Sequence, residues 1–281
     1  MWWLVIILDY NQVCLANLFK QVSNTENIEE GLVRHMVLNS IRSIVKKFSN
    51  HGNVVIACDG PSYWRREYFP QYKQHRKADR EKSGHDWATI FSILHKIREE
   101  LDENMPYCVI RLPGAEADDI IATLAKRYAP HESVIIVSSD KDFVQLHTNK
   151  NVRQWSPIQN KFVTSDDPLQ EKIEHILSGD RGDGVPNVLS PDNTFVDGIR
   201  QKVISKKKLN DWMHRPVEYQ SLPGYKRNQM MIDFDYIPTA ITDGIIQQYE
   251  AYANKPMIRQ KMLNYFIQNR LKNLIESIHD F

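Results

Sequence analysis

Acidic residues follow four of the short apolar runs in this sequence. They stand at or just beyond the point where each run stops: Asp9, Asp59, Glu116, Asp118, Asp119, Asp140 and Asp142. The carboxyl ends of parallel strands meet at one edge of a sheet, and α/β proteins bind their ligands there. A single acid in such a place is often a helix cap or a turn residue, and Asp119 fits that alternative best. Agreement among four runs favours a shared site.

Clustered carboxylates repel one another unless cations neutralise them. Oxygen ligands without an accompanying His/Cys set favour Mg²⁺ or Mn²⁺ over zinc. Two such ions suit in-line displacement at a phosphodiester. A further pair, Asp180 and Asp183, lies in a glycine-rich run, where one helical turn would place both on the same face. The alternatives for this pair are solvated turn acids and, less favoured, a calcium site without the EF-hand spacing.

Charge is unevenly divided along the chain, although the whole carries only +1. Residues 101–197 hold 9 basic and 16 acidic residues, whereas residues 198–230 hold 8 and 2 and residues 61–85 hold 7 and 3. Residues 62–77 also interleave aromatic with basic side chains, a mixture that can stack on bases and pair with phosphates. A small aromatic core is the alternative. An acidic centre with basic flanks indicates a cation site beside a polyanion site.

The elements that would position these residues follow a regular order. Apolar runs predict strands at residues 4–8, 53–58, 106–112 and 133–137, and helical spacing predicts helices at 31–48, 86–101 and 115–129. This order predicts an α/β fold with an open, mostly parallel central sheet and helices on both faces. We expect this core in residues 1–165 and a helical region in 166–281. Residues 249–278 are expected to be helical, and the stretch 262–281 is expected to be core packing rather than a partner helix.

Length and composition are those of an ordinary globular protein. The 281 residues are 42% hydrophobic and 25% charged, which excludes a disordered chain, a collagen and a disulfide-stapled miniprotein. The three cysteines are scattered, so a reducing compartment is expected. We find neither a signal peptide nor an apolar run long enough for a membrane span, and expect a soluble intracellular protein.

The chain resembles the 5′-nucleases of the flap endonuclease class over essentially its whole length, and within them the ribonuclease H branch of the T-even bacteriophages. The resemblance rests on ordered segments: residues 7–12, 63–66, 72–76, 115–119, 138–143, 154–157, 179–183 and 232–238. It implies a PIN-like core that holds two Mg²⁺ ions, with Mn²⁺ as a substitute. The first metal site would consist of Asp9, Asp59, Glu116, Asp118 and Asp140. The second would consist of Asp142, Asp180 and Asp183, with Asp118 or Asp119 between the two sites.

The same resemblance implies roles for basic and aromatic residues. Lys73 and Arg76 would stabilise charge at the scissile phosphate, and Tyr72 would stack on a terminal base. Residues 61–105 would form a bridge or arch. Other nucleic-acid contacts would come from Arg65, Arg66, Lys77, Lys206, Lys207 and Lys208. The sequence departs from the family at Gly184, where Asn is usual, and lacks a recognisable duplex-binding hairpin in residues 185–199, so the basic stretch 200–227 is expected to replace it.

The function implied is that of a Mg²⁺-dependent 5′→3′ exonuclease and flap endonuclease. It would act on DNA and RNA–DNA hybrids with a free 5′ end and remove RNA primers in phage lagging-strand replication. The enzyme is expected to be a monomer in the host cytoplasm, without a membrane partner, that meets a sliding clamp and a single-strand-binding protein. Three alternatives remain open: a PIN-like ribonuclease on single-stranded RNA, a non-catalytic structure-specific DNA-binding protein and, more distantly, a phosphatase.

Overall fold

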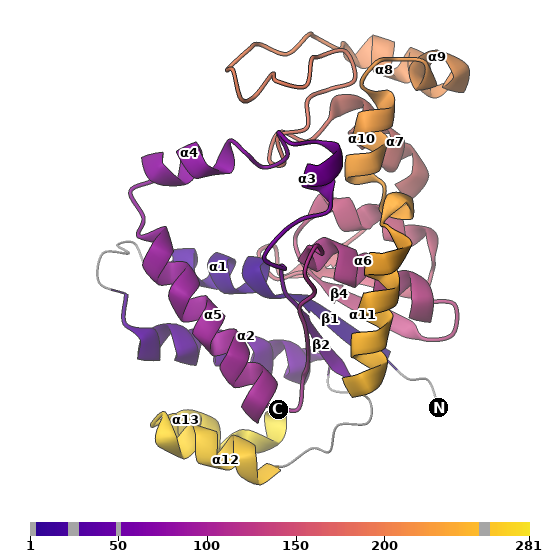
Figure 1. The fold of residues 1–281 in the computed structure, drawn as a ribbon. Helices are drawn as coiled ribbons and strands as arrows, with labels where there is room; N and C mark the ends of the chain where they lie inside the picture. The colour runs from indigo at the N-terminus through magenta and orange to yellow at the C-terminus, as the bar shows by residue number, and fades with distance from the viewer. Residues whose placement is uncertain (1–3, 22–27, 49–51, 253–258) are drawn as a thin grey trace.

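A six-stranded sheet forms the centre of the molecule (Figure 1). The computed structural model describes residues 4–21, 28–48, 52–252 and 259–281. The strand order is β3-β2-β1-β4-β5-β6, and only β6 is antiparallel to its neighbour. The strands are β1 (Leu4–Asp9), β2 (Val54–Ala57), β3 (Cys108–Ile110), β4 (Ser133–Val137), β5 (Val152–Ser156) and β6 (Lys161–Val163). The predicted open, mostly parallel sheet is confirmed.

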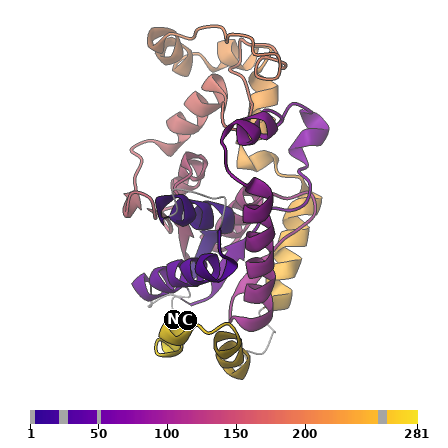
Figure 2. The same ribbon diagram turned by 90° about the vertical axis from the view of Figure 1, so that its left-hand side faces the viewer.

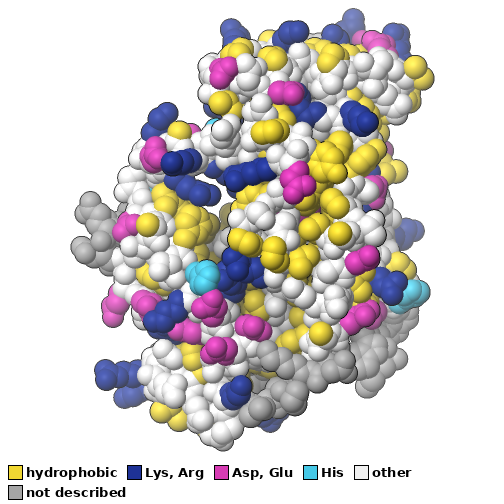
Figure 3. Space-filling model, in the orientation of Figure 1, with side chains coloured by type: hydrophobic (Ala, Val, Ile, Leu, Met, Phe, Trp, Pro, Cys, Tyr) yellow, Lys and Arg dark blue, Asp and Glu magenta, His cyan; other side chains and the backbone are white. Residues whose placement is uncertain are grey.

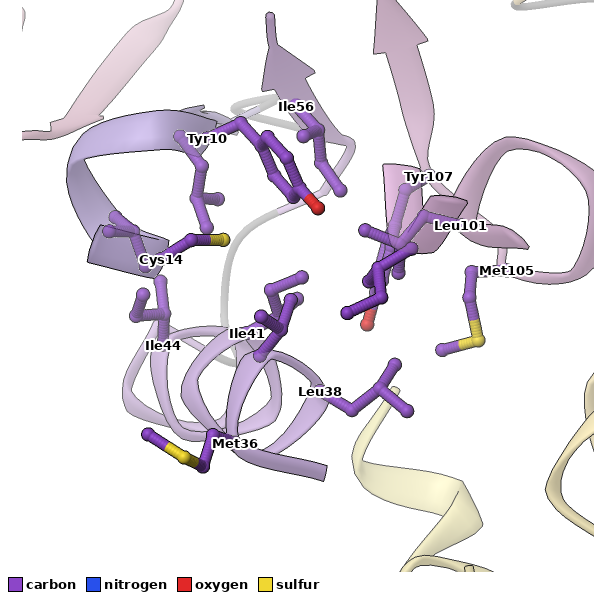
Figure 4. Packing of buried hydrophobic residues seen from close by; sticks show 14 of the residues in the cluster. Tyr10, Cys14, Met36, Leu38, Ile41, Ile44, Ile56, Leu101, Met105 and Tyr107 are labelled. Carbon is purple, nitrogen blue, oxygen red and sulfur yellow. The ribbon is translucent and has the colours of Figure 1, made fainter. Parts of the chain in front are cut away.

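Helices cover both faces of this sheet (Figure 2). Ile6 and Leu8 of β1 pack into a core with α1 (Tyr10–Gln21), α2 (Glu30–Lys47) and α5 (Trp87–Asn104). Figure 4 shows part of this core, in which Ile41 of α2 and Leu101 of α5 approach Ile56 of β2. Val5 and Ile7 face the other way, toward α6 (Ala117–Tyr128) and α11 (Thr239–Tyr252). Because both faces are buried, the strands read as continuous apolar runs.

Several predicted bounds differ from the observed ones. The third strand is shorter than residues 106–112, because Leu112 leaves the sheet to form a turn in which Ala115 N donates to the Leu112 carbonyl. Strands β5 and β6 were not predicted. Polar residues interrupt the apolar pattern of β5, and one of them, Gln154, is fully buried because its amide donates to the Ser138 and Asp140 carbonyls. The helix α1 also went unpredicted.

The first part of the segment predicted as a bridge, residues 61–86, lies away from the sheet and contains α3 (Arg65–Tyr68) and α4 (Arg76–Lys82). The second part is α5, which packs on the sheet. In Figure 1, α4 and α5 enclose a gap beside the carboxyl edge of the sheet, and the space-filling view in Figure 3 shows that this region is hollowed. Lys and Arg side chains gather at its upper rim.

The chain beyond the sheet is helical, as predicted. It contains α7 (Pro168–Ser178), α8 (Lys206–Met213), α9 (Pro216–Gln220), α10 (Tyr225–Ile232), α12 (Arg259–Gln268) and α13 (Lys272–Ile275), with 3₁₀ turns at Lys141–Thr148 (η1), Phe234–Tyr236 (η2) and Ile278–Asp280 (η3). Helices α7 to α10 form a third core with Phe69 and Tyr72. Met262 and Phe266 of α12 join the first core. The predicted helix at 249–278 is divided, since α12 ends at Gln268 and α13 begins at Lys272. Residues 253–258 of that prediction lie outside the described residues. No helix in the described parts of the chain is both long and apolar enough to cross a membrane.

Candidate active site

Carboxylates meet at the carboxyl edge of the sheet. Asp9 ends β1, Asp59 lies two residues beyond β2, and Asp140 lies three residues beyond β4. These three strands are neighbours in the order β2-β1-β4. The loop after β3 leads to Glu116, the N-cap of α6, and to Asp118 in its first turn. The convergence predicted from the sequence is therefore present in the fold.

Hydrogen bonds from the local backbone and side chains fix these carboxylates. Asp9 accepts from the Gln12 amide at 3.1 Å and from the Ser138 hydroxyl at 3.2 Å. The Ser138 hydroxyl in turn accepts from the Asp140 amide at 3.2 Å. Asp59 accepts from Asn11 Nδ2 at 2.8 Å and from the Ala117 amide at 2.9 Å. The strand ends of β1, β2 and β4 are thus tied together through their acidic residues.

The site carries more negative charge than its cations balance. Burial, followed by repulsion from Asp59, raises the pKa of Asp9 to about 7. Burial and the Asp140 charge raise the pKa of Asp118 well above its ordinary range. Burial and the charges of Asp140, Asp183 and Asp180 do the same to the pKa of Asp142. Carboxylates in this condition attract cations, and the oxygen atoms of Asp9, Asp59, Asp118 and Asp140 are the ligand type that hard divalent ions prefer. Within the described residues, no three of these four carboxylates have ligand atoms that all lie within 4.8 Å of one another.

Two residues predicted to act at the site lie inside the protein instead. Arg65 is 2% exposed and Asp119 is 0% exposed. Arg65 Nη1 donates to Asp119 at 2.8 Å and to Glu116 at 2.9 Å, and Trp64 Nε1 donates to Asp119 at 3.1 Å. Asp119 also accepts from the Glu116 amide as part of a capping box. We therefore correct both assignments: the Arg65 guanidinium is buried against carboxylates rather than exposed to a phosphate, and both Asp119 oxygens accept hydrogen bonds inside the protein.

Tyr72 is also internal, which contradicts its predicted stacking on a terminal base. Its side chain is 1% exposed, and its hydroxyl donates to Asp183 at 2.6 Å and lies 3.0 Å from Glu116. Burial, followed by these two negative charges, raises the pKa of Tyr72 well above its usual range, so the hydroxyl keeps its proton. Tyr72 thus holds two carboxylates in place.

Lys73 and Arg76 border the carboxylates, as the resemblance implied. Lys73 forms an ion pair with Glu116 and lies 3.5 Å from Asp183, and Arg76 Nη2 lies 2.6 Å from Asp183. Although burial opposes it, these cations lower the pKa of Asp183. Both cations also line a cavity of about 390 Å³ that contains further basic side chains: Arg66, Lys77 and Arg80. Lys206, Lys207 and Lys208 are exposed on α8, away from this cavity at the upper end of the view in Figure 1.

A second group of ligand atoms lies where η1 meets α7. Asp142, His175 and Asp180 are the residues in the described part of the chain whose ligand atoms come close enough to share an ion, within 4.8 Å of one another. Although burial opposes it, the His175 hydrogen bond and the Lys141 charge lower the pKa of Asp180. Asp183 is tied to this group because its amide donates to Asp180 at 3.1 Å. The sequence interpretation missed His175. The signal was a histidine five residues before Asp180, near the end of a helix.

The departure at Gly184 has a steric reason. Gly184 has φ +74°, and a Cβ there would lie 2.9 Å from His75 Nδ1. Its backbone conformation is one that side chains rarely adopt. A side chain at residue 184 would therefore displace His75 or the loop that carries Asp183.

Comparisons with known proteins identify the family. The model for the 5′–3′ exonuclease N-terminal resolvase-like domain matches residues 5–174, and the T4 RNase H C-terminal model matches residues 168–281. The chain belongs to the 5′–3′ exonuclease family. It is 36% identical to ribonuclease H of Enterobacteria phage T4 over 99% of this chain and 95% of that protein. It is 33% identical to the flap endonuclease Xni of Shewanella piezotolerans over 50% of this chain and 56% of that protein.

The structure of this 5′–3′ exonuclease family member has the fold of solved phage enzymes. The bacteriophage T5 D15 flap endonuclease, solved as a pseudo-enzyme-product complex with DNA and metal ions, superposes with a TM-score of 0.64 over 90% of this chain and 100% of that chain, at 18% identity. The T5 D15 protein co-crystallised with metal ions gives a TM-score of 0.63. The resemblance noted in the sequence is confirmed. The chain is an enzyme of the exonuclease and flap endonuclease type, which sets aside the binding-protein alternative.

Proposed function

We propose that this nuclease is a Mg²⁺-dependent 5′→3′ exonuclease and flap endonuclease that removes RNA primers during phage lagging-strand replication. The observation that carries the proposal is the excess of buried negative charge at the sheet edge, beside a cavity lined with cations. The first ion would be held by Asp9, Asp59, Asp118 and Asp140, with Glu116 behind them. The second would be held by Asp142, Asp180 and Asp183. When bound, such ions activate water and stabilise the leaving oxygen.

The chain's own cations would position the substrate phosphate. Lys73 and Arg76 are held between carboxylates and the basic cavity, so a phosphate in that cavity would compete with Glu116 and Asp183 for them. Their positive charge would then stabilise the charge that develops at the scissile phosphodiester. Arg66 and Lys77 would contact the strand at the same cavity, and Lys206, Lys207 and Lys208 would contact duplex farther away.

The substrate and the setting are inferred from the relatives. Similarity to phage T4 ribonuclease H supports RNA–DNA hybrids as substrates, and similarity to flap endonucleases supports DNA with a free 5′ end. We further propose action as a monomer in the host cytoplasm, contacts with a sliding clamp and a single-strand-binding protein, and substitution of Mn²⁺ for Mg²⁺. The division into a nuclease core to residue 165, with an arch at 61–105, and a helical region at 166–281 belongs to the same proposal.

Cleavage of labelled substrates tests this function. Three 5′-labelled substrates would be compared, namely flap DNA, an RNA primer on DNA and single-stranded RNA, each with Mg²⁺ and with EDTA. The variant would carry Asp140→Asn and Asp142→Asn together. The control would carry Asp166→Asn and Asp211→Asn, which alter two exposed carboxylates outside the site. We expect Mg²⁺-dependent release of short 5′ products from the first two substrates by the wild type and the control, and none from the double variant.

Other outcomes would overturn the proposal in different ways. Preferred cleavage of single-stranded RNA would favour the PIN-like ribonuclease alternative. Cleavage that persists in EDTA or in the double variant would contradict a metal-dependent reaction at this carboxylate edge. Tight DNA binding without turnover in either Mg²⁺ or Mn²⁺ would contradict the proposed activity altogether.

A further inference from the structure

His175 lies between two of the carboxylates assigned to the second ion. Its Nε2 atom is 2.9 Å from Asp180 Oδ2, and its Nδ1 atom is 3.4 Å from Asp142 Oδ1. All three side chains are largely buried, with exposed fractions of 12% for His175, 13% for Asp180 and 14% for Asp142. The imidazole therefore faces the same small volume as the two carboxylates.

One atom of this group has no hydrogen-bond partner. Asp142 Oδ1 is buried and accepts no hydrogen bond, although buried carboxylate oxygens ordinarily do. It is the same oxygen that His175 Nδ1 approaches to 3.4 Å, without forming a hydrogen bond. An ion shared by Asp142, Asp180 and one ring nitrogen would satisfy it.

The backbone holds the three residues in this arrangement. Gly179 ends α7 with φ +71°, and a Cβ there would lie 2.4 Å from the Val185 carbonyl oxygen. Only glycine allows the sharp bend that returns Asp180 toward His175, one turn back on the helix. A cavity of about 280 Å³ beside the group is lined by Asp142 and His175, by the acidic Glu171 and Glu174, and by the basic Lys141 and Lys172. Lys141 Nζ lies 3.2 Å from Asp180 Oδ2, so a metal ion that enters from this cavity would take the place of the lysine at that oxygen.

We propose that His175 supplies a nitrogen ligand to the second metal ion, which makes this site prefer Mn²⁺, Co²⁺ or Zn²⁺ over Mg²⁺. The inference rests on the proposed function, because it adds a ligand to a site assigned there. Imidazole suits first-row transition ions, whereas Mg²⁺ prefers oxygen. The first group, by contrast, offers oxygen ligands alone. The two sites would therefore differ in the metal that each prefers.

Pulsed electron paramagnetic resonance of bound Mn²⁺ tests this directly, since it detects a coordinated ¹⁴N nucleus without requiring turnover. The full chain would be loaded with Mn²⁺ as the wild type, as His175→Gln and as His214→Gln, which alters an exposed histidine outside the site. Calorimetric titrations with Mn²⁺ and with Mg²⁺ would accompany the spectra. Thermal unfolding would verify that each variant is folded.

We expect ¹⁴N modulation in the wild type and in His214→Gln, and its loss in His175→Gln. That variant should bind Mn²⁺ at least about tenfold more weakly. A loss of about tenfold is already usual when a residue that only hydrogen-bonds to a metal ligand is changed, so loss of a ligand itself should cost no less. Its affinity for Mg²⁺ should change less. The substitution His175→Asp replaces nitrogen with oxygen, so it should abolish the ¹⁴N signal and shift the preference toward Mg²⁺. This second variant retains a ligand if His175→Gln does not fold.

Absence of ¹⁴N modulation in the wild type, or its persistence in both His175 variants, would overturn the inference and leave His175 as a hydrogen-bond partner of Asp180. Failure of this inference can be distinguished from failure of the proposed function. Flap cleavage by the wild type with Mg²⁺ but without nitrogen ligation would reject His175 as a metal ligand and leave the proposed function intact. Nitrogen ligation without cleavage of any substrate would support the ligand and reject the nuclease proposal.

Discussion

Asp9 should destabilise the protein when no divalent cation is present. Its carboxyl is 7% exposed, and burial together with Asp59 raises its pKa from the ordinary 3.8 to about 7. A group whose pKa is raised by folding contributes stability below its unfolded pKa and loses it as the pH rises through the folded value. The interval from about 4 to about 7 corresponds to roughly 4 kcal/mol of unfolding free energy.

The substitution Asp9→Asn removes this penalty while keeping the shape of the side chain. The amide oxygen can still accept from the Gln12 backbone, and the Ser138 hydroxyl can rotate to accept from the new NH₂ group. Part of the rise in pKa is repulsion from Asp59 and Asp140, which their own protonation would lessen, so we take half of the full value, about 2 kcal/mol, as the smallest expected gain at pH 8. That is roughly 4–8 °C in Tm for a chain of this size.

Thermal unfolding in EDTA between pH 4 and pH 8, followed by circular dichroism, measures this gain. Asp9→Asn should unfold at a higher temperature than the wild type at pH 8, and the difference should vanish near pH 4. Asp211→Asn, an exposed control on α8, should follow the wild type throughout. Added Mg²⁺ should raise the Tm of the wild type more than that of Asp9→Asn. Equal or lower stability of Asp9→Asn at pH 8, or a difference independent of pH, would contradict a destabilising charge on Asp9.

The remaining predictions concern single parts of the site. Arg65→Ala leaves Asp119 buried without its cation, so it should lower the unfolding free energy by about 3–5 kcal/mol in chemical denaturation, whereas exposed Arg66→Ala should cost little stability. Replacing all three lysines of 206–208 with alanine should weaken DNA binding and reduce the magnitude of the slope of log affinity against log salt concentration by about 3. The cleavage rate at saturating substrate should not change. An unchanged slope would show that α8 does not contact DNA. Gly184→Asn should lower both the Tm and the cleavage rate, because residue 184 has φ +74° and its new Cβ would collide with His75. A Tm equal to that of the wild type would show that the loop relaxes to accept the side chain.

Four of the six strands, β1 to β4, and the carboxylates at their carboxyl ends could be predicted from the sequence. The strands β1, β2 and β4 are short apolar runs because both of their faces are buried, and that signal is local. An acid that follows such a run must lie at the carboxyl edge of a parallel sheet, so Asp9, Asp59 and Asp140 could be placed without tertiary information. The hydrophobic pattern did not predict β5, because Gln154 in this strand is polar but buried. Its side-chain amide donates to the backbone carbonyls of Ser138 and Asp140, which are distant in sequence.

Which polar residues face solvent depends on tertiary packing, and the sequence pattern did not reveal it. Arg65, Tyr72 and Asp119 have the residue types of a nucleic-acid or metal site, yet packing of α3 against α6 and α10 buries them in one hydrogen-bonded network. His175 lies outside the segments on which the family resemblance rests. It contacts Asp142, more than thirty residues away in sequence, because η1 packs against α7. Burial and pairing of charges are set by such long-range contacts, because a charged group leaves water only where the fold supplies its partner.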